Sequence, residues 1–151
     1  MKGWTAAGVK KKREHPEADF QRQLVKWLKM ILPLGSIVHA SPNEEKSAKQ
    51  AAINVGMGVF AGWADITILT GPFLIFLECK SKDGRQSADQ KKFQRLVTAM
   101  GRPYEVVRTL DEALGALRKH AIPTRIISGP NVPAHLIRLA LPEKGPPCQL
   151  H

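Results

Sequence analysis

Cysteine is almost absent from this sequence, which has 151 residues and contains only Cys79 and Cys148. Two such residues cannot build a disulfide framework, and neither they nor the five histidines have the spacing of zinc ligands. Long apolar runs are missing too. No run reaches the ~18 residues of a membrane span, and no apolar segment follows the basic start as it would in a secretory signal. We therefore expect a cytoplasmic protein with no membrane partner.

Acidic residues are also few, with 13 Asp and Glu against 23 Lys and Arg, which leaves a net charge of +10 and a pI near 10.0. Such an excess indicates a polyanionic partner, because Lys and Arg contacts to phosphates release condensed counterions. The alternatives are a basic protein without such a partner and one that binds anionic membrane. No amphipathic basic helix with a large apolar face supports the second alternative.

Charge and proline divide the chain into three parts. Residues 1–14 are predicted to be a basic arm. Residues 15–120 alternate between periodic apolar stretches and turn signals, and their number suits one compact domain. Six of the 11 prolines lie from Ile122 onward, so residues 121–151 are predicted to be a proline-rich tail.

Within the domain, apolar periodicity predicts a helix, a strand, a helix, a hairpin, a helix, a strand and a helix. Strands 73–80 and 104–108 flank a crossover helix and should be parallel, whereas the hairpin adds an antiparallel pair. The run FLIFL is nearly all apolar, as expected of a strand that is covered on both faces. The predicted fold class is therefore α/β, with a mixed β-sheet flanked by helices.

The expected bounds rest on local start and stop signals. They are a helix from Pro16 to a stop at Pro33 and Gly35, a strand over 36–40, a helix from about Glu44 to Gly56, hairpin strands over 64–69 and 73–80, a helix capped by Ser87 and Gln90 with the apolar stripe Phe93, Leu96, Val97 and Met100, a strand over 104–108, and a helix capped by Thr109 and Glu112.

The hairpin geometry bears on two acids. If residues 71–72 form a two-residue turn, counting down the ladder puts Asp65 directly opposite Glu78. Side chains paired in this way share a face, with Cβ atoms roughly 4.5–5.5 Å apart. Lys80 lies two residues beyond Glu78 and points the same way, while Cys79 points to the other face as a buried thiol. A three-residue loop would instead change the parity and separate the acids, unless a bulge restored it.

Two facing carboxylates repel each other if they are left alone. They become favourable when a divalent cation lies between them, since hard cations such as Mg²⁺ bind carboxylate oxygens. A lysine beside them can orient or deprotonate a water or stabilise charge on a phosphate, and the metal lowers the pKa of the water. Asp65, Glu78 and Lys80 are thus the minimum equipment for phosphodiester hydrolysis. The alternative is that both acids end strands near solvent and that Lys80 forms an ordinary ion pair.

Glu17 can join this group from the first helix. It precedes Phe20, Gln21 and Leu24 by three, four and seven residues, so it lies at the border of the buried stripe and at the helix start. A carboxylate there can reach over the sheet toward the hairpin. The alternative is a first-turn acid that only interacts favourably with the helix dipole.

Two stretches carry a family resemblance, HASPNEEKSAKQAAINVGMGVFAGWADITIL and FLIFLECKSKDGRQSADQKKFQRLVTAMGRPYEVV. They combine the HxxPN-like residues 39–43, an Asp after a glycine-rich approach, ExK at a strand end and a Gln in the next helix, and an acid in the first helix precedes them. In these features roughly residues 15–118 are similar to the VRR-NUC (virus-type replication-repair nuclease) domain. That family belongs to the PD-(D/E)xK superfamily, which has a restriction-endonuclease-like core. Ala64 stands where the family usually has proline, which removes no ligand but leaves the local backbone less fixed.

The resemblance implies a Mg²⁺- or Mn²⁺-dependent DNA endonuclease. The implied metal ligands are Asp65, Glu78, Glu17 and the backbone carbonyl of Cys79. Lys80 would act on the nucleophilic water. Gln90 falls where the family places its glutamine and would join the catalytic set, although its capping-box position offers a purely structural reason for it.

Stand-alone members of this size resemble phage-type enzymes that cut branched DNA, including four-way junctions, as homodimers. A dimer suits a junction because two symmetric cuts are needed, and such an enzyme would act in a bacterial or phage-infected cell. Residues beside the site are expected to hold the DNA backbone, although a solvated helix face is the alternative for those on the helix. The candidates are Lys82, Arg85, Lys91, Lys92 and Asn43, with Gly84 and Arg95 close by.

Two other functions compete with this interpretation. A non-catalytic basic DNA-binding protein with a vestigial nuclease site would use the positive surface alone, but it has no need of the acids and the lysine. A sequence-specific restriction-type endonuclease would share the fold, but so short a chain has no room for an additional target-recognition domain.

Overall fold

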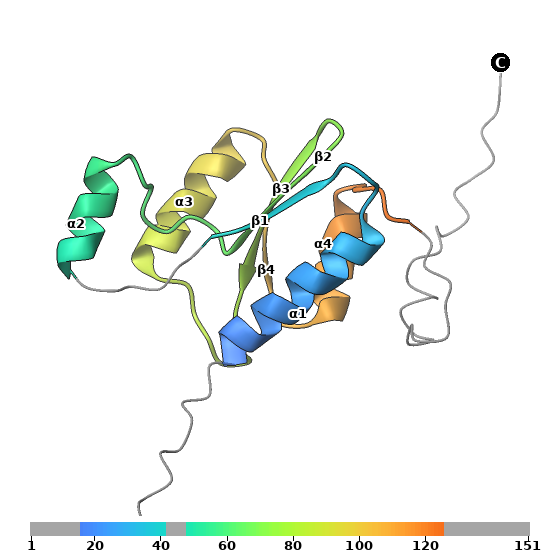
Figure 1. Cartoon of the computed structure of the whole chain (residues 1–151), viewed down its shortest axis with the longest axis horizontal. Coiled ribbons are helices and arrows are strands. Elements are labelled where there is room, and N and C mark those ends of the chain that lie inside the picture. Colours follow the sequence, from blue (N-terminus) through green and yellow to red (C-terminus); the bar gives the residue numbers. More distant parts are fainter. Residues whose placement is uncertain (1–15, 42–47, 126–151) are drawn as a thin grey trace, which may run out of the picture.

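The computed structural model describes residues 16–41 and 48–125. Within them the chain forms helices and strands in the predicted order (Figure 1). The elements are α1 (Pro16–Ile31), β1 (Ile37–Ala40), α2 (Ala48–Gly56), β2 (Ile66–Thr70), β3 (Phe73–Cys79), α3 (Ala88–Ala99), β4 (Tyr104–Val107) and α4 (Leu110–Lys119). The predicted arm 1–14, the expected helix start near Glu44, the candidate DNA contact Asn43 and residues 126–151 lie outside the described residues.

The strands form one mixed sheet in the order β1-β2-β3-β4. β1 and β3 both pair antiparallel with β2, whereas β3 and β4 are parallel and joined through α3. Helices α1 and α4 cover one face of the sheet and α3 lies on the other (Figure 1). The predicted fold class is therefore confirmed. Among the described residues, no helix is long and apolar enough to cross a membrane.

The hairpin has the register that the two-residue turn predicts. Thr70 pairs with Phe73, and the ladder continues to Ile66 opposite Leu77. One further step down the same ladder places Asp65 across from Glu78, at the open end of the hairpin. The turn has two residues, so both acids lie on the same face of the sheet, as the sequence predicts for a turn of that length.

Both faces of β3 are buried, as the run FLIFL predicts, because its side chains alternate between two apolar clusters. Leu77 and Cys79 face α1 and α4, whereas Phe76 faces α3. The larger cluster includes Leu24, Leu28, Ile66, Ile68, Ile75, Leu77, Val107, Leu114 and Leu117. The smaller cluster consists of Ala64, Phe76, Phe93, Val97 and Tyr104.

The predicted apolar stripe of α3 is only half buried. Phe93 and Val97 are 3% and 7% exposed, but Leu96 and Met100 are 40% and 71% exposed. Residues 93 and 97 form one row along the helix, and residues 96 and 100 form the neighbouring row. Leu96 and Met100 of the predicted apolar stripe are therefore exposed, because the smaller cluster contacts only the first of these rows.

Residues 121–125, assigned above to the tail, pack on α1. Ile122 is 5% exposed and belongs to the larger core. The guanidinium of Arg125 donates to the backbone carbonyl oxygens of Leu32, Lys29 and Met30. These oxygens lie in and just beyond the last turn of α1, where carbonyls have no partner within the helix, so Arg125 caps that helix end.

Gly62 fixes the segment that leads into Asp65. Its φ is +77°, and a Cβ at this position would collide with the backbone of Asp89 and Gln90 at the start of α3. Gly58 has a similar φ of +85°, but a Cβ there would meet nothing within 4 Å. Comparing substitutions at the two glycines therefore distinguishes the cost of backbone strain from the cost of a collision with α3.

We predict that Gly58→Ala costs about 1 kcal/mol of unfolding free energy, since a left-handed conformation strains an L-residue. Gly62→Ala should cost about 3 kcal/mol, because α3 must also shift away. Urea unfolding followed by circular dichroism measures both. Equal losses would show that the contact between residue 62 and α3 contributes nothing.

Candidate active site

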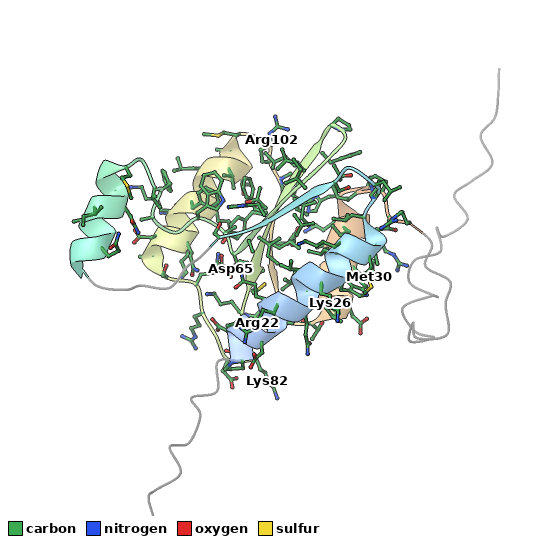
Figure 2. All side chains as sticks on the ribbon, in the orientation of Figure 1. Arg22, Lys26, Met30, Asp65, Lys82 and Arg102 are labelled. Carbon is green, nitrogen blue, oxygen red and sulfur yellow. The ribbon has the colours of Figure 1, made fainter. Side chains whose placement is uncertain are left out.

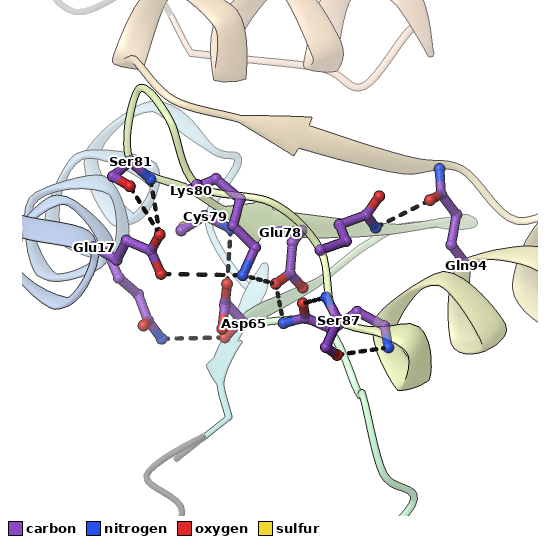
Figure 3. A network of polar contacts seen from close by, with 12 residues as sticks. Glu17, Asp65, Glu78, Cys79, Lys80, Ser81, Ser87 and Gln94 are labelled. Atoms are coloured by element: carbon purple, nitrogen blue, oxygen red, sulfur yellow. Dashed lines mark hydrogen bonds and ion pairs between the residues drawn. The ribbon is translucent and has the colours of Figure 1, made fainter.

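Side chains from three parts of the fold meet at the open end of the β2–β3 hairpin. Glu17 comes from the first turn of α1, Glu78 comes from the end of β3 and Lys80 directly follows that strand, and Asp65 immediately precedes β2. Figure 3 shows these four side chains pointing toward one another. The structure therefore brings together the acids and the lysine that the sequence singled out.

Glu78 is the most deeply buried of the four, with an exposed fraction of 0%. Its Oε1 lies 2.9 Å from Nζ of Lys80 and also accepts a hydrogen bond from Nε2 of Gln90. Its Oε2 accepts a hydrogen bond from the hydroxyl of Tyr104 at 3.0 Å. Burial and the charge of Asp65 raise the pKa of Glu78 to about 7, although Lys80 and Tyr104 oppose the shift.

Asp65 is held from two sides. Its Oδ2 accepts a hydrogen bond from the backbone N–H of Cys79 at 2.8 Å. Its backbone oxygen accepts from the backbone N–H of Ser41 at 2.9 Å and from the side-chain amide of Gln21 at 3.3 Å. Strand β3, the residue after β1 and helix α1 thus all fix the position of this aspartate.

Lys80 forms an ion pair inside the site. It is 8% exposed, and its Nζ lies 2.9 Å from Glu78 and 4.0 Å from Oε2 of Glu17. Burial alone would lower the pKa of Lys80, but the hydrogen bond to Glu78 and the charges of all three acids raise it. In this arrangement Lys80 is therefore an ammonium at neutral pH.

Glu17 reaches the end of the hairpin, as its place in α1 predicts. Its Oε1 accepts from the backbone N–H of Ser81 at 3.0 Å and from the Ser81 hydroxyl at 3.1 Å. Gly84 packs so closely that a Cβ there would collide with this carboxylate oxygen. Glu17 thus pins the loop that follows β3, while its role as a metal ligand stays a prediction.

Gln90 caps the start of α3, as its spacing predicts, and also contacts Glu78, while its place in the catalytic set stays a prediction. Its Oε1 accepts from the backbone N–H of Ser87 at 2.8 Å, and the Ser87 side chain accepts from the Gln90 backbone N–H, which completes a capping box. Its Nε2 donates to Glu78. One side chain therefore caps the start of α3 and connects it to the buried carboxylate.

The chemistry of the donor set suits a divalent cation. Asp65 and Glu78 face each other, and the charge of one raises the pKa of the other. A cation between them would relieve this repulsion. Within residues 16–41 and 48–125, no group of three His, Cys, Asp or Glu side chains is arranged to hold a metal ion. The further ligands, Glu17 and the backbone carbonyl of Cys79, therefore stay predictions, and water can complete the shell of Mg²⁺, which keeps several waters.

The side chain of Cys79 points away from this site. It is 2% exposed within the larger core, and burial raises the pKa of its thiol far above the usual range. The thiol is therefore inert at neutral pH, as predicted. The backbone N–H of Cys79 contacts the site through Asp65, while its carbonyl as a metal ligand stays a prediction.

Exposed cations lie on the same elements as the site residues. Four of the predicted DNA contacts, Lys82, Arg85, Lys91 and Lys92, are exposed on the loop after β3 and on the first turns of α3. Arg22 and Lys26 of α1, which the sequence did not single out, are exposed as well. Figure 2 places Arg22 and Lys82 near the start of α1, and Asp65 between α1 and α3.

Tyr104, Ser81 and Gln21 are site residues that sequence reasoning missed. Gln21 lies one helical turn after Glu17, so i, i+4 spacing could have found it. Ser81 directly follows the ExK motif, and a hydroxyl there could have been noted. No local pattern indicates Tyr104, since its contact with Glu78 depends on the pairing of β4 with β3.

No protein-family model matches this chain, and no curated protein matches it. Among solved structures, it is similar to a protein described as "VRR_NUC domain protein", with a TM-score of 0.56 and 22% sequence identity. The likeness covers 72% of this chain and 89% of that protein. It establishes the fold, in which the mixed sheet and its flanking helices form a restriction-endonuclease-like core.

The raised pKa of Glu78 predicts a pH-dependent stability. The folded protein holds the Glu78 proton up to about pH 7, whereas an ordinary glutamate releases it near 4.5. The unfolding free energy therefore falls as the pH rises through this window, and Glu78→Gln removes that loss. With a chelator present, the variant should gain up to about 3 kcal/mol over wild type between pH 4.5 and pH 8. Chemical unfolding at several pH values measures the difference.

Glu105→Gln is the matched control because the pKa of Glu105 is shifted in the opposite direction to that of Glu78. Burial alone would raise the pKa of Glu105, but hydrogen bonds from Lys119 and His120 lower it. The stability that Glu105 contributes is present above the ordinary glutamate pKa and is lost as the pH falls. Glu105→Gln should therefore lose stability relative to wild type as the pH rises from 3 to 6. If the difference in unfolding free energy between Glu78→Gln and wild type did not change with pH, the raised pKa of Glu78 would be contradicted.

Proposed function

We propose that this protein is a metal-dependent DNA endonuclease of the VRR-NUC type. The observation that carries the proposal is the cluster at the end of the hairpin, where Asp65 faces the buried Glu78 and the Lys80 ammonium lies 2.9 Å from Glu78. The fold that the chain shares with a VRR_NUC domain protein and the net charge of +10 support it. Fold alone would not suffice, since function depends on the site.

Asp65 and Glu78, with the backbone carbonyl of Cys79, are the groups that would hold Mg²⁺ or Mn²⁺. When bound, such an ion supplies a Lewis acid and lowers the pKa of water. The remaining chemistry belongs to the protein. Burial of the carboxylates keeps bulk water from competing for their charge, and in such surroundings each interaction with a phosphate is stronger than it would be in water.

Lys80 acts in this proposal as a cation. Because its pKa is raised, it donates a hydrogen bond and does not accept a proton in the arrangement described. An ammonium there can orient the attacking water or stabilise negative charge on the scissile phosphate. Glu17 keeps Lys80 and the following loop in place through its contacts with Nζ of Lys80 and with Ser81.

We further propose that the substrate is branched DNA, such as a four-way junction, and that the enzyme acts as a homodimer. The exposed cations beside the site fit a phosphate backbone, and two symmetric cuts call for two sites. The second candidate is a DNA-binding protein with a vestigial site. Against it stands the cost of a fully buried Glu78 and a nearly buried Lys80, which a protein that only binds DNA does not need.

We predict that wild type cuts labelled DNA with Mg²⁺ or Mn²⁺ and not with a chelator. Asp65→Asn, Glu78→Gln and Lys80→Met should each lower the rate at least about a hundredfold while DNA binding persists, because each removes a group that acts on the reacting phosphate or its metal. Four-way junction, flap and plain duplex substrates, compared on gels, report the preferred structure.

Asp111→Asn is the matched control for these variants. Asp111 is an exposed acid in the first turn of α4, outside the cluster, and its loss should leave the cutting rate unchanged. If wild type binds DNA but cuts none of the substrates with either metal, the nuclease proposal fails and the DNA-binding protein replaces it.

We also predict that the exposed cations beside the site hold the phosphate backbone. The double variant Lys82→Ala/Arg85→Ala should weaken binding and reduce the slope of log affinity against log salt by about 2, one for each lost phosphate contact. Fluorescence anisotropy with the chelator present, over a salt series, measures both quantities.

The control for this pair is Arg102→Ala/Arg118→Ala. Arg102 lies on the opposite side of the molecule from Lys82, with Asp65 between them (Figure 2), and Arg118 lies in the last turn of α4. Both arginines are exposed, so the total charge changes equally. A loss of slope as large as that of Lys82→Ala/Arg85→Ala would indicate diffuse attraction without a defined DNA-contacting surface.

A further inference from the structure

Tyr104 contacts the carboxylate oxygen of Glu78 that neither Lys80 nor Gln90 contacts. Lys80 and Gln90 both contact Oε1, and the Tyr104 hydroxyl donates to Oε2 at 3.0 Å. Tyr104 is 7% exposed, its ring contacts Phe93 edge-on, and its backbone pairs with Phe76 in β3. The hydroxyl is therefore held at a defined position relative to the carboxylate.

Gln86 sets the direction in which this hydroxyl donates. Its Nε2 lies 3.4 Å from the Tyr104 oxygen and 3.0 Å from Oε1 of Gln94. A side-chain amide has two N–H groups, so each can have one acceptor. Because an amide N–H occupies a lone pair of the Tyr104 oxygen, the hydroxyl proton is left to point at Glu78. Figure 3 shows the Gln94 end of this chain of contacts.

Gln86 also belongs to the loop of residues 81–87, between β3 and α3. The start of this loop is bound to Glu17 through Ser81, and its end is bound to Glu78 through Gln86 and Tyr104. The exposed Lys82 lies between these two anchors, and the exposed Arg85 directly precedes Gln86. The segment that carries these exposed cations is thus connected by hydrogen bonds to Glu17 at its start and, through Tyr104, to Glu78 at its end.

We propose that Tyr104 is a positioning residue that fixes the Glu78 carboxylate for cation binding, and that Gln86 extends this control to the cationic loop 81–87. The proposal rests on the proposed nuclease function. Neither residue is expected to touch the substrate's reacting atoms. Both act through Glu78, in the way that groups bonded to metal ligands orient those ligands.

The test is Mn²⁺ binding measured by electron paramagnetic resonance on the full chain without DNA. Tyr104→Phe keeps the ring and removes only the hydroxyl, so its affinity for Mn²⁺ should fall about tenfold. The Mn²⁺ affinity of Gln86→Leu should lie between those of Tyr104→Phe and wild type. In cleavage assays the Mn²⁺ concentration for half-maximal rate should rise in the same order, while the rate at saturating Mn²⁺ stays close to wild type.

Thr67→Val is the matched control. Thr67 is 6% exposed, and its hydroxyl accepts from Nε1 of Trp63. This variant also deletes one buried hydroxyl from the sheet, but outside the hydrogen bonds of Glu78, and should leave Mn²⁺ binding unchanged.

The outcomes separate this proposal from the proposed function. If wild type binds Mn²⁺ and cuts, but Tyr104→Phe and Gln86→Leu bind Mn²⁺ as wild type does, the positioning role is overturned and the nuclease stands. If Thr67→Val loses as much affinity as Tyr104→Phe, the effect is a general loosening of the sheet and the role is again overturned. If wild type neither binds Mn²⁺ nor cuts, both proposals fail together.

Discussion

The buried carboxylate of Glu78 is the group around which the rest of this structure is arranged. Placing a charge at 0% exposure is expensive unless hydrogen bonds and opposite charge compensate it. The compensating groups come from three places: Lys80 just past β3, Gln90 in α3 and Tyr104 in β4. Satisfying one side chain therefore orients the hairpin, the crossover helix and the last strand relative to one another.

The polar cluster lies where the two apolar cores end. Along β3 the side chains pack against α1 and α4 on one face and against α3 on the other, up to the point at which Glu78 replaces an apolar residue. Across the described residues, no buried side-chain nitrogen or oxygen lacks a hydrogen-bond partner. The fold thus holds a charged site in place with its own groups. This arrangement sacrifices some stability for preorganisation, since Glu78 would ionise more readily in water than it does here.

The loop after β3 connects this buried site to the surface. Glu17 binds its start and Gln86 its end, while the cations between them face solvent. Gly84 lies within it, and a Cβ there would press on the carboxylate of Glu17, which would then have to shift. A short connection between two elements therefore carries exposed cations and holds site residues at once, which is common where rigid elements carry a functional loop.

The features that can be read from the sequence are those that depend on residues close together in the chain. Helix caps at Ser87 and Thr109, the buried strand FLIFL and the order of elements follow from local signals. The facing of Asp65 and Glu78 follows from the two-residue turn between their strands, because strand parity needs only a count of residues. The approach of Glu17 follows from its place on the border of a buried helix face.

Tertiary structure alone decided which surfaces find partners. Leu96 and Met100 have the same periodicity as Phe93 and Val97. Phe93 and Val97 are buried, and Leu96 and Met100 are exposed, because the smaller core contacts only one row of α3. The contact of Tyr104 with Glu78, the second bond of Gln90 and the capping of α1 by Arg125 all join elements far apart in the chain. No periodicity encodes such contacts, because they depend on how the elements pack and on which buried polar atoms then need a partner.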